Sequence, residues 1–334
     1  MRRFILALTF LLSTSTVFAA EPNPGPMILA LRLVHREGKL DAIKPANDGK
    51  LKATLAKAFV KDGGLTEANA GGLFPSSVFA RLAGGDGRLT AEEIASAMST
   101  DVPASRERLV PKVRAYADRL TTSFDRIDAT HRKAVDELVE FIVANYEPRK
   151  PLPAICICTA NSRRSVLGMA MGNVAAAYYG LPEVRFSCGG TERSSVNSRA
   201  IRALKAIGVA IEPTGEHAPK GDPETPNPIY AIRWGTSGDP AFEAREFSKV
   251  YSDPHNPRNG FAALMVCSDA DEACPLVKGA SARISMPFFD PKVYDGTAYE
   301  EEKYDERRDD IGRVLLSALT QARRGLIESG KIKN

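Results

Sequence analysis

Residues 154–165 read Ala154-Ile155-Cys156-Ile157-Cys158-Thr159-Ala160-Asn161-Ser162-Arg163-Arg164-Ser165. The apolar run over 154–157 predicts a buried strand, and apolar residues at helical spacing predict a helix over 165–179. Short apolar runs keep alternating with helical stretches toward the C-terminus. They predict strands at 184–187 and 261–266 and helices at 197–207 and within 302–328. This alternation predicts an α/β fold built on a doubly wound parallel sheet.

The loop between the first strand and its helix has the composition of an anion site. Ligands of doubly wound sheets bind outside the carboxyl ends of the strands, where Cys158 stands. Converging backbone N–H groups and the helix N-terminus attract an anion and favour the thiolate of Cys158. Arg164 can hold two oxygens of a tetrahedral oxyanion, Ser165 can bond the thiolate, and Asn161 can brace the loop. We therefore expect a Cys158 nucleophile beside the oxyanion-binding residues Thr159, Ala160, Asn161, Ser162, Arg163, Arg164 and Ser165. The alternative is a buried cysteine with a helix-capping arginine.

This loop resembles the phosphate loop of the low-molecular-weight protein tyrosine phosphatase superfamily, which includes the thioredoxin-linked arsenate reductases. The segment Ser187-Cys188-Gly189-Gly190-Thr191 is similar to that family's Ser-Ala-Gly-Thr segment, and residues 197–211 resemble its second helix and following strand. The resemblance covers about residues 152–328. It implies a phosphotyrosine phosphatase I-like fold that starts with a strand, a phosphate loop and a helix, with Cys158 as nucleophile and Arg164 as oxyanion clamp.

A second segment, Val266-Cys267-Ser268-Asp269-Ala270-Asp271-Glu272-Ala273-Cys274-Pro275, resembles the redox segment of the arsenate reductases. The resemblance implies a relay in which Cys158 attacks arsenate and Cys267 attacks the resulting adduct and releases arsenite. Cys274 then takes over the disulfide for reduction by a thioredoxin-like or other dithiol partner. The alternative is a static structural disulfide between Cys267 and Cys274, which an oxidising compartment favours.

The family's leaving-group acid is an aspartate that precedes a proline and follows the redox segment. This chain has Asp-Pro pairs at Asp222, Asp239, Asp253 and Asp290. Asp290 follows the cysteine pair in the family's order, and it is therefore the expected proton donor. The other three match ordinary turn chemistry.

The chain departs from the family pattern in several places. Arg163 stands where many reductases have a further cysteine, and it is expected to add a second positive charge beside the site. Cys156 and Cys188 are expected to be buried core residues. Residues 213–260 form a connection longer than a minimal member needs, which predicts either a substrate-binding loop or a cover for the sheet.

The N-terminal residues 1–20 have the pattern of a signal peptide. Two arginines precede an apolar run over 4–12, and Ala19 and Ala20 are small residues for a signal peptidase. The apolar run is shorter than the roughly 20 residues that span a bilayer, so an uncleaved membrane anchor is the less favoured alternative. We expect an exported, periplasmic protein with no membrane attachment after cleavage.

Residues 21–150 are expected to be helical. Residues 21–102 form a predicted helical module with degenerate EF-hand-like pieces at 47–51 and 85–93. The second piece has Leu82 and Gly84 where a calcium loop needs oxygen ligands, so calcium binding is the less favoured alternative. Residues 103–150 form a helical segment expected to pack on the catalytic domain, 151–334.

Composition narrows the choice of function further. The 334 residues include 45 Lys and Arg against 41 Asp and Glu. Without the two arginines of the expected signal segment the balance is 43 against 41, and this small positive charge gives no argument for a nucleic-acid partner. The four histidines show no metal-ligand spacing, and no metal or organic cofactor is implied. The leading hypothesis is a thiol-dependent arsenate reductase acting on a small oxyanion. The alternatives are a phosphomonoester (tyrosine) phosphatase and an inactive module that binds an oxyanion or calcium.

Overall fold

The computed structural model describes residues 65–66, 86–89 and 104–333, apart from residues 122, 222–223, 237, 239–241 and 274–275. The chain divides into two compact units, Met1–Asp101 and Val102–Asn334. The expected signal segment 1–20 and most of the expected module 21–102 lie outside the described residues. In the first unit, β1 (Leu65–Thr66) pairs antiparallel with β2 (Arg88–Leu89), which belongs to the EF-hand-like piece 85–93.

The second unit has a parallel sheet of four strands in the order β4-β3-β8-β9. The prediction of an α/β fold with a parallel sheet flanked by helices is confirmed. The central strand β3 begins before and ends after its predicted range, because it includes Leu152 and Cys158. The strands are β3 (Leu152–Cys158), β4 (Val184–Gly190), β8 (Phe261–Met265) and β9 (Ala280–Ser285).

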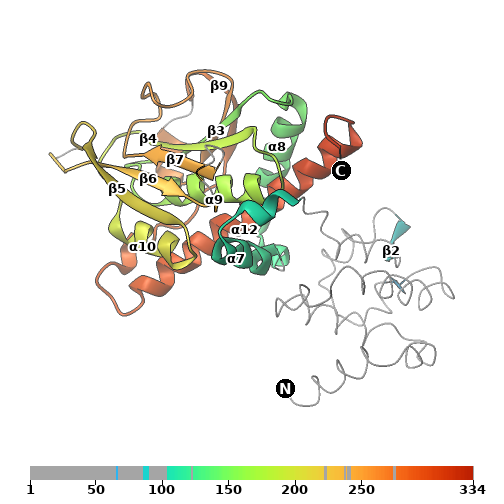
Figure 1. Ribbon diagram of the computed structural model, residues 1–334, viewed down its shortest axis with the longest axis horizontal. Coiled ribbons are helices and arrows are strands. Elements are labelled where there is room, and N and C mark those ends of the chain that lie inside the picture. Colours follow the sequence, from blue (N-terminus) through green and yellow to red (C-terminus); the bar gives the residue numbers. More distant parts are fainter. Residues whose placement is uncertain are drawn as a thin grey trace, which may run out of the picture. The chain divides into compact units, whose positions relative to one another are not determined.

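Helix α9 (Arg164–Tyr178) follows β3 and is buried along its whole length (Figure 1). Two glycines let it lie close to the sheet. A Cβ at Gly168 would lie 2.8 Å from Sγ of Cys156, and one at Gly172 would lie 2.4 Å from the ring of Phe186. The helix therefore packs closely against β3 and β4.

The helical stretch before the sheet shares the hydrophobic core of the sheet. It contains η3 (Ala104–Arg108), α7 (Pro111–Thr121), η4 (Phe124–Arg126) and α8 (Ala129–Asn145). The long C-terminal helix α12 (Glu300–Glu328) packs on α7, α8 and α9. The helices before β3 are thus part of the same packed unit as the parallel sheet.

A second sheet, which the sequence did not predict, occupies most of the long connection. Its strands β5 (Ala210–His217), β6 (Pro228–Arg233) and β7 (Glu243–Glu246) pair antiparallel in that order. The chain then returns to the edge of the main sheet, where Gly190 N donates to Lys249 O and Tyr251 N donates to Gly190 O. Helix α10 (Ser198–Ala206) precedes this sheet.

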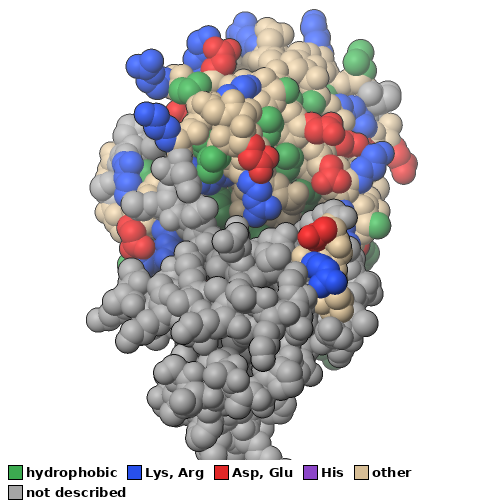
Figure 2. All heavy atoms as spheres, turned by 90° about the vertical axis from the view of Figure 1, so that its right-hand side faces the viewer, with side chains coloured by type: hydrophobic (Ala, Val, Ile, Leu, Met, Phe, Trp, Pro, Cys, Tyr) green, Lys and Arg blue, Asp and Glu red, His purple; other side chains and the backbone are tan. Residues whose placement is uncertain are grey.

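Short elements follow the last two strands of the main sheet. They are α11 (Ser268–Ala273) after β8 and the 3-10 helix η6 (Pro291–Tyr294) after β9. No helix among the described residues is both long and apolar enough to cross a membrane. Acidic and basic side chains are interspersed on the described part of the face in Figure 2.

Candidate functional site

The predicted nucleophile lies at the carboxyl end of the central strand. Cys158 is the last residue of β3 and is 4% exposed, and Ser165 stands in the first turn of α9. The Sγ of Cys158 lies 3.1 Å from the Oγ of Ser165. The expected contact between this hydroxyl and the cysteine sulfur is therefore present.

Asn161 braces the loop from inside the protein. Its backbone is in the left-handed region, with φ of 42°, and its side chain is fully buried. Its Nδ2 donates to the carbonyl oxygens of Phe247 at 3.4 Å and Lys249 at 3.2 Å. Its Oδ1 accepts a hydrogen bond of 2.8 Å from Ser165. These contacts fix a conformation that most residues other than glycine avoid.

The carbonyl groups of the loop are bonded to the surrounding chain. Thr191 N donates to Cys158 O at 3.1 Å, and Glu192 N donates to Thr159 O at 2.9 Å. The hydroxyls of Ser194 and Ser248 both donate to Ala160 O. By contrast, the backbone N–H groups of residues 159–163 have no acceptor within the described residues. Backbone N–H groups in folded proteins are nearly always paired, so this set is available to an anion.

The expected clamp and the expected acid are side by side. Arg164 is almost fully buried; its guanidinium donates to Phe288 O at 3.0 Å and pairs with Oδ2 of Asp290 at 2.8 Å. The other carboxylate oxygen of Asp290 accepts from Lys292 N and caps η6. Of the other Asp-Pro residues, Asp253 pairs with His255, while 222 and 239 lie outside the described residues.

Arg163 differs from its expected role. Its Nε donates to the hydroxyl of Tyr304 at 2.9 Å, and its Nη2 lies 3.6 Å from Oδ2 of Asp295. Burial and the hydrogen bond to Asp295 raise the pKa of Tyr304 to about 12, so that hydroxyl stays protonated at neutral pH. The guanidinium of Arg163, which was expected to add a second positive charge beside the site, therefore faces Asp295 near the start of α12.

Cys267 lies next to the loop and has a free thiol. It is fully buried between β8 and α11, and its Sγ lies 3.6 Å from the hydroxyl of Thr159, the residue after Cys158. Ala270 N also lies 3.4 Å from this sulfur and donates to it. The predicted partner Cys274 lies outside the described residues.

Cys156 and Cys188 are core residues, as expected. They are register partners on β3 and β4, and both are fully buried. Burial raises the pKa of both thiols, which keeps them protonated and unreactive. The Sγ of Cys188 lies 3.5 Å from a carboxylate oxygen of Glu246.

A buried ion pair behind the loop was missed from the sequence. Lys249 and Glu246 are 2% and 8% exposed in their side chains, and the ammonium bonds directly to the carboxylate. They belong to the run Arg245-Glu246-Phe247-Ser248-Lys249, whose mixed charges are typical of an exposed segment. No spacing or composition signal in the sequence distinguishes this pair from a solvated one.

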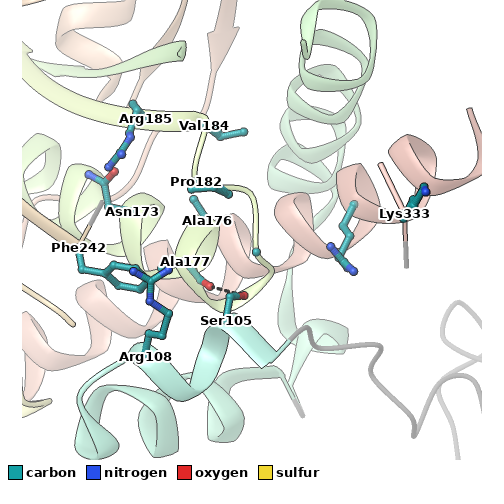
Figure 3. A pocket seen from close by; sticks show the side chains of 12 residues that line it. Ser105, Arg108, Asn173, Ala176, Ala177, Pro182, Val184, Arg185, Phe242 and Lys333 are labelled. Atoms are coloured by element: carbon teal, nitrogen blue, oxygen red, sulfur yellow. Dashed lines mark hydrogen bonds between the residues drawn. The ribbon is translucent and has the colours of Figure 1, made fainter. Parts of the chain in front are cut away.

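A cavity of about 370 Å³ lies elsewhere in this unit (Figure 3). Its lining includes Asn173 and Ala177 from the second half of α9, together with Arg108, Arg185 and Phe242. Cys158 and Arg164 are not among its lining residues, because they lie at the other end of α9. The cavity is therefore separate from the candidate site.

The candidate site thus gathers Cys158, Ser165, Arg164, Asp290 and Cys267 at the carboxyl ends of β3, β8 and β9. Among the described residues, no three His, Cys, Asp or Glu side chains are grouped so that they could hold a metal ion. In comparisons with known proteins, no family model matches this chain and no curated protein matches it.

Proposed function

We propose that this protein is a thiol-dependent reductase of a small oxyanion, with arsenate as the substrate, and that it belongs to the superfamily its phosphate loop resembles. The observation that carries the proposal is the second free thiol at the loop. The Sγ of Cys267 lies 3.6 Å from the hydroxyl of Thr159, one residue from the nucleophile. A phosphatase needs no thiol at this position, whereas a reductase needs one to break the adduct.

The loop supplies the binding of the oxyanion. Its unpaired backbone N–H groups and the N-terminus of α9 favour a negative charge in front of Cys158. Arg164 adds a guanidinium that holds two oxygens of a tetrahedral anion. Asp290 pairs with this guanidinium at 2.8 Å, so its carboxyl group lies beside the proposed anion site.

The proposed reaction proceeds through three thiols. The Cys158 thiolate forms a sulfur–arsenic bond, and one hydroxyl of arsenate leaves as water after taking a proton from Asp290. The Cys267 thiolate then attacks the Cys158 sulfur, so that a disulfide forms while the sulfur–arsenic electron pair stays on arsenic and arsenite departs. Cys274 attacks Cys267 next, which moves the disulfide to these two residues and releases the Cys158 thiolate. A thioredoxin-like or other dithiol partner supplies the two electrons that reduce it.

The direct test measures arsenite released from arsenate by the mature chain with a dithiol reductant. We expect steady turnover by the native protein, none by Cys158→Ser, and about one event per molecule by Cys274→Ser. Cys156→Ser is the matched control, because its sulfur is fully buried in the core on the central strand. Arsenite release that continues at the native rate in Cys267→Ser would reject the relay.

Phosphomonoester hydrolysis is the second candidate, and one observation favours it. Phe289, next to the proposed acid, is 57% exposed, and its ring centroid lies 6.5 Å from that of Tyr294. Two aromatic rings beside the clamp suit an aryl phosphate. Hydrolysis of para-nitrophenyl phosphate that survives Cys267→Ser, without any arsenite release, would establish this activity instead. Loss of both activities in a folded protein that binds phosphate would indicate an inactive oxyanion-binding module.

Export through the segment 1–20 belongs to the same proposal. It places the reaction in the periplasm, where the electron donor must be an exported dithiol protein. Fractionation of cells that express the full chain, with the mature N-terminus identified by mass spectrometry, tests this placement.

A further inference from the structure

The segment Glu246–Val250, here called the strap, lies against the phosphate loop. It follows β7 and belongs to the long connection that contains the second sheet. Its carbonyl groups at Phe247 and Lys249 accept from Nδ2 of Asn161, and its Ser248 hydroxyl donates to Ala160 O at 3.1 Å. Lys249 O also accepts from Gly190 N at 2.9 Å. The strap thus connects the loop to the edge strand β4.

These contacts determine which way the Asn161 amide points. A carbonyl oxygen only accepts hydrogen bonds, so the side of Asn161 that faces the strap must be its NH₂ group. The amide oxygen must then face Ser165, from which it accepts at 2.8 Å. The Ser165 hydroxyl has one proton to donate and lies 3.1 Å from Cys158 Sγ. The Ser165 hydroxyl thus contacts both Asn161 and Cys158, so the strap, through Asn161, positions the group next to the nucleophile.

The strap itself is held by the buried pair of Glu246 and Lys249. The same Glu246 oxygen that bonds the Lys249 ammonium lies 3.5 Å from the Cys188 thiol, and the ammonium lies 4.9 Å from the centre of the Phe247 ring. Burial lowers the pKa of Lys249, but the charge of Glu246 and its hydrogen bond outweigh this effect and raise the pKa overall. The lysine is therefore charged at neutral pH.

A buried ion pair adds little to stability compared with apolar residues of similar size. A pair in this place must be explained by something other than stability. The ion pair joins the two ends of the segment 246–249. Backbone and side-chain groups of this segment bond Asn161 and Ala160 of the loop. The pair therefore sets the position of the backbone carbonyls to which Asn161 bonds.

We propose that Glu246 and Lys249 are positioning residues for the phosphate loop, and that through Asn161 and Ser165 they set the reactivity of Cys158. The proposal rests on the proposed function in so far as Cys158 is the nucleophile. It does not depend on which oxyanion reacts.

The test is the alkylation of Cys158 by iodoacetamide between pH 5 and 9, measured by mass spectrometry of the peptide that contains it. The strap variant Glu246→Gln/Lys249→Met replaces both partners, so no unpaired charge stays buried. We expect alkylation of this variant to be about tenfold slower at pH 7, because the loop that the strap positions no longer holds its backbone N–H groups in line with the Cys158 sulfur. The matched control is Asp310→Asn/Arg313→Met, an ion pair on α12 whose arginine bonds Ser123 instead of the loop. We expect the control to keep the native profile.

A native profile in a folded strap variant, as judged by near-ultraviolet circular dichroism, overturns the proposal. If the strap variant does not fold, Ser248→Ala decides, because it removes the bond to Ala160 and leaves the ion pair intact. A slower rate in Ser248→Ala supports the proposal, and a native rate overturns it. Alkylation requires no substrate, so absence of arsenite release rejects the proposed function without affecting this result.

Discussion

Replacement of Gly190 by alanine tests the packing behind the candidate loop, residues 158–165. A Cβ at this position would lie 2.5 Å from Thr159 O, 2.8 Å from Asn161 N and 2.3 Å from Glu192 O, all of which are backbone atoms. Ordinary contact begins at 3.4 Å, so the loop must move away by roughly 1 Å. A displacement of about 1 Å at reacting groups costs on the order of 100-fold in rate, or about 2.7 kcal/mol of transition-state stabilisation.

The same clash also lowers stability. Overpacking of this kind costs about 1–3 kcal/mol, which for a unit of this size lowers Tm by roughly 2–4 °C per kcal/mol. Thermal denaturation followed by circular dichroism measures the stability, and arsenite release together with Cys158 alkylation measures the site. Gly238→Ala is the matched control, because nothing lies within 4 Å of a Cβ there. A Gly190→Ala protein with native Tm and native activity would refute the reasoning.

Three further predictions concern single charged groups. Arg164→Lys replaces a two-pronged guanidinium by a point charge, and we expect phosphate affinity measured by calorimetry to fall by about tenfold or more. Asp290→Asn removes the proposed proton donor, and we expect arsenate turnover to fall by about 10²–10⁴-fold. Phosphate affinity should be unchanged or tighter, because the ion pair with Arg164 is lost. Asp128→Ala removes the N-cap of α8, whose carboxylate accepts from His131 N, and we expect a loss of about 1 kcal/mol in urea denaturation at pH 7. Burial raises the pKa of Asp128, but the hydrogen bonds from His131 outweigh burial and lower this pKa overall. The carboxylate therefore contributes to stability above the usual Asp pKa of about 3.9, and the contribution is lost as the pH falls through the lower pKa of the folded state. The stability difference between the native protein and the variant should shrink in strong acid.

The core of the fold was predictable because its signals are local. The strand β3 is buried on both faces and therefore appears in the sequence as an unbroken apolar run. The carboxyl ends of parallel strands meet at one edge, so Cys158 and Cys267 were expected to come together although more than 100 residues separate them. Asp290 was expected at the site only from the family resemblance, because no strand was predicted over 280–285. The contacts of Arg164 with Asp290 and of Cys267 with Thr159 agree with that expectation.

The second sheet and the strap could not be predicted for a physical reason. The strands β5, β6 and β7 are largely exposed and have charged residues and prolines instead of a regular apolar alternation. The burial of Lys249 depends on a partner three residues away and on the neighbouring strand, and neither contact leaves a pattern in composition. The contacts of Arg163 likewise depend on Tyr304, which is 141 residues away in the chain.

The complete burial of α9 has a consequence for local opening of the molecule. The amides of a helix that is enclosed on every side exchange with solvent only when the whole unit unfolds. Helix α11, which follows Cys267, instead exposes Ser268, Asp269 and Glu272, and we therefore expect it to open at lower free energy. In hydrogen exchange, the N-terminal half of α9 should be among the slowest segments and α11 among the fastest. The loop proposed to bind the anion thus lies beside the segment that we expect to be the most persistent, and the second thiol precedes a segment that we expect to open more readily.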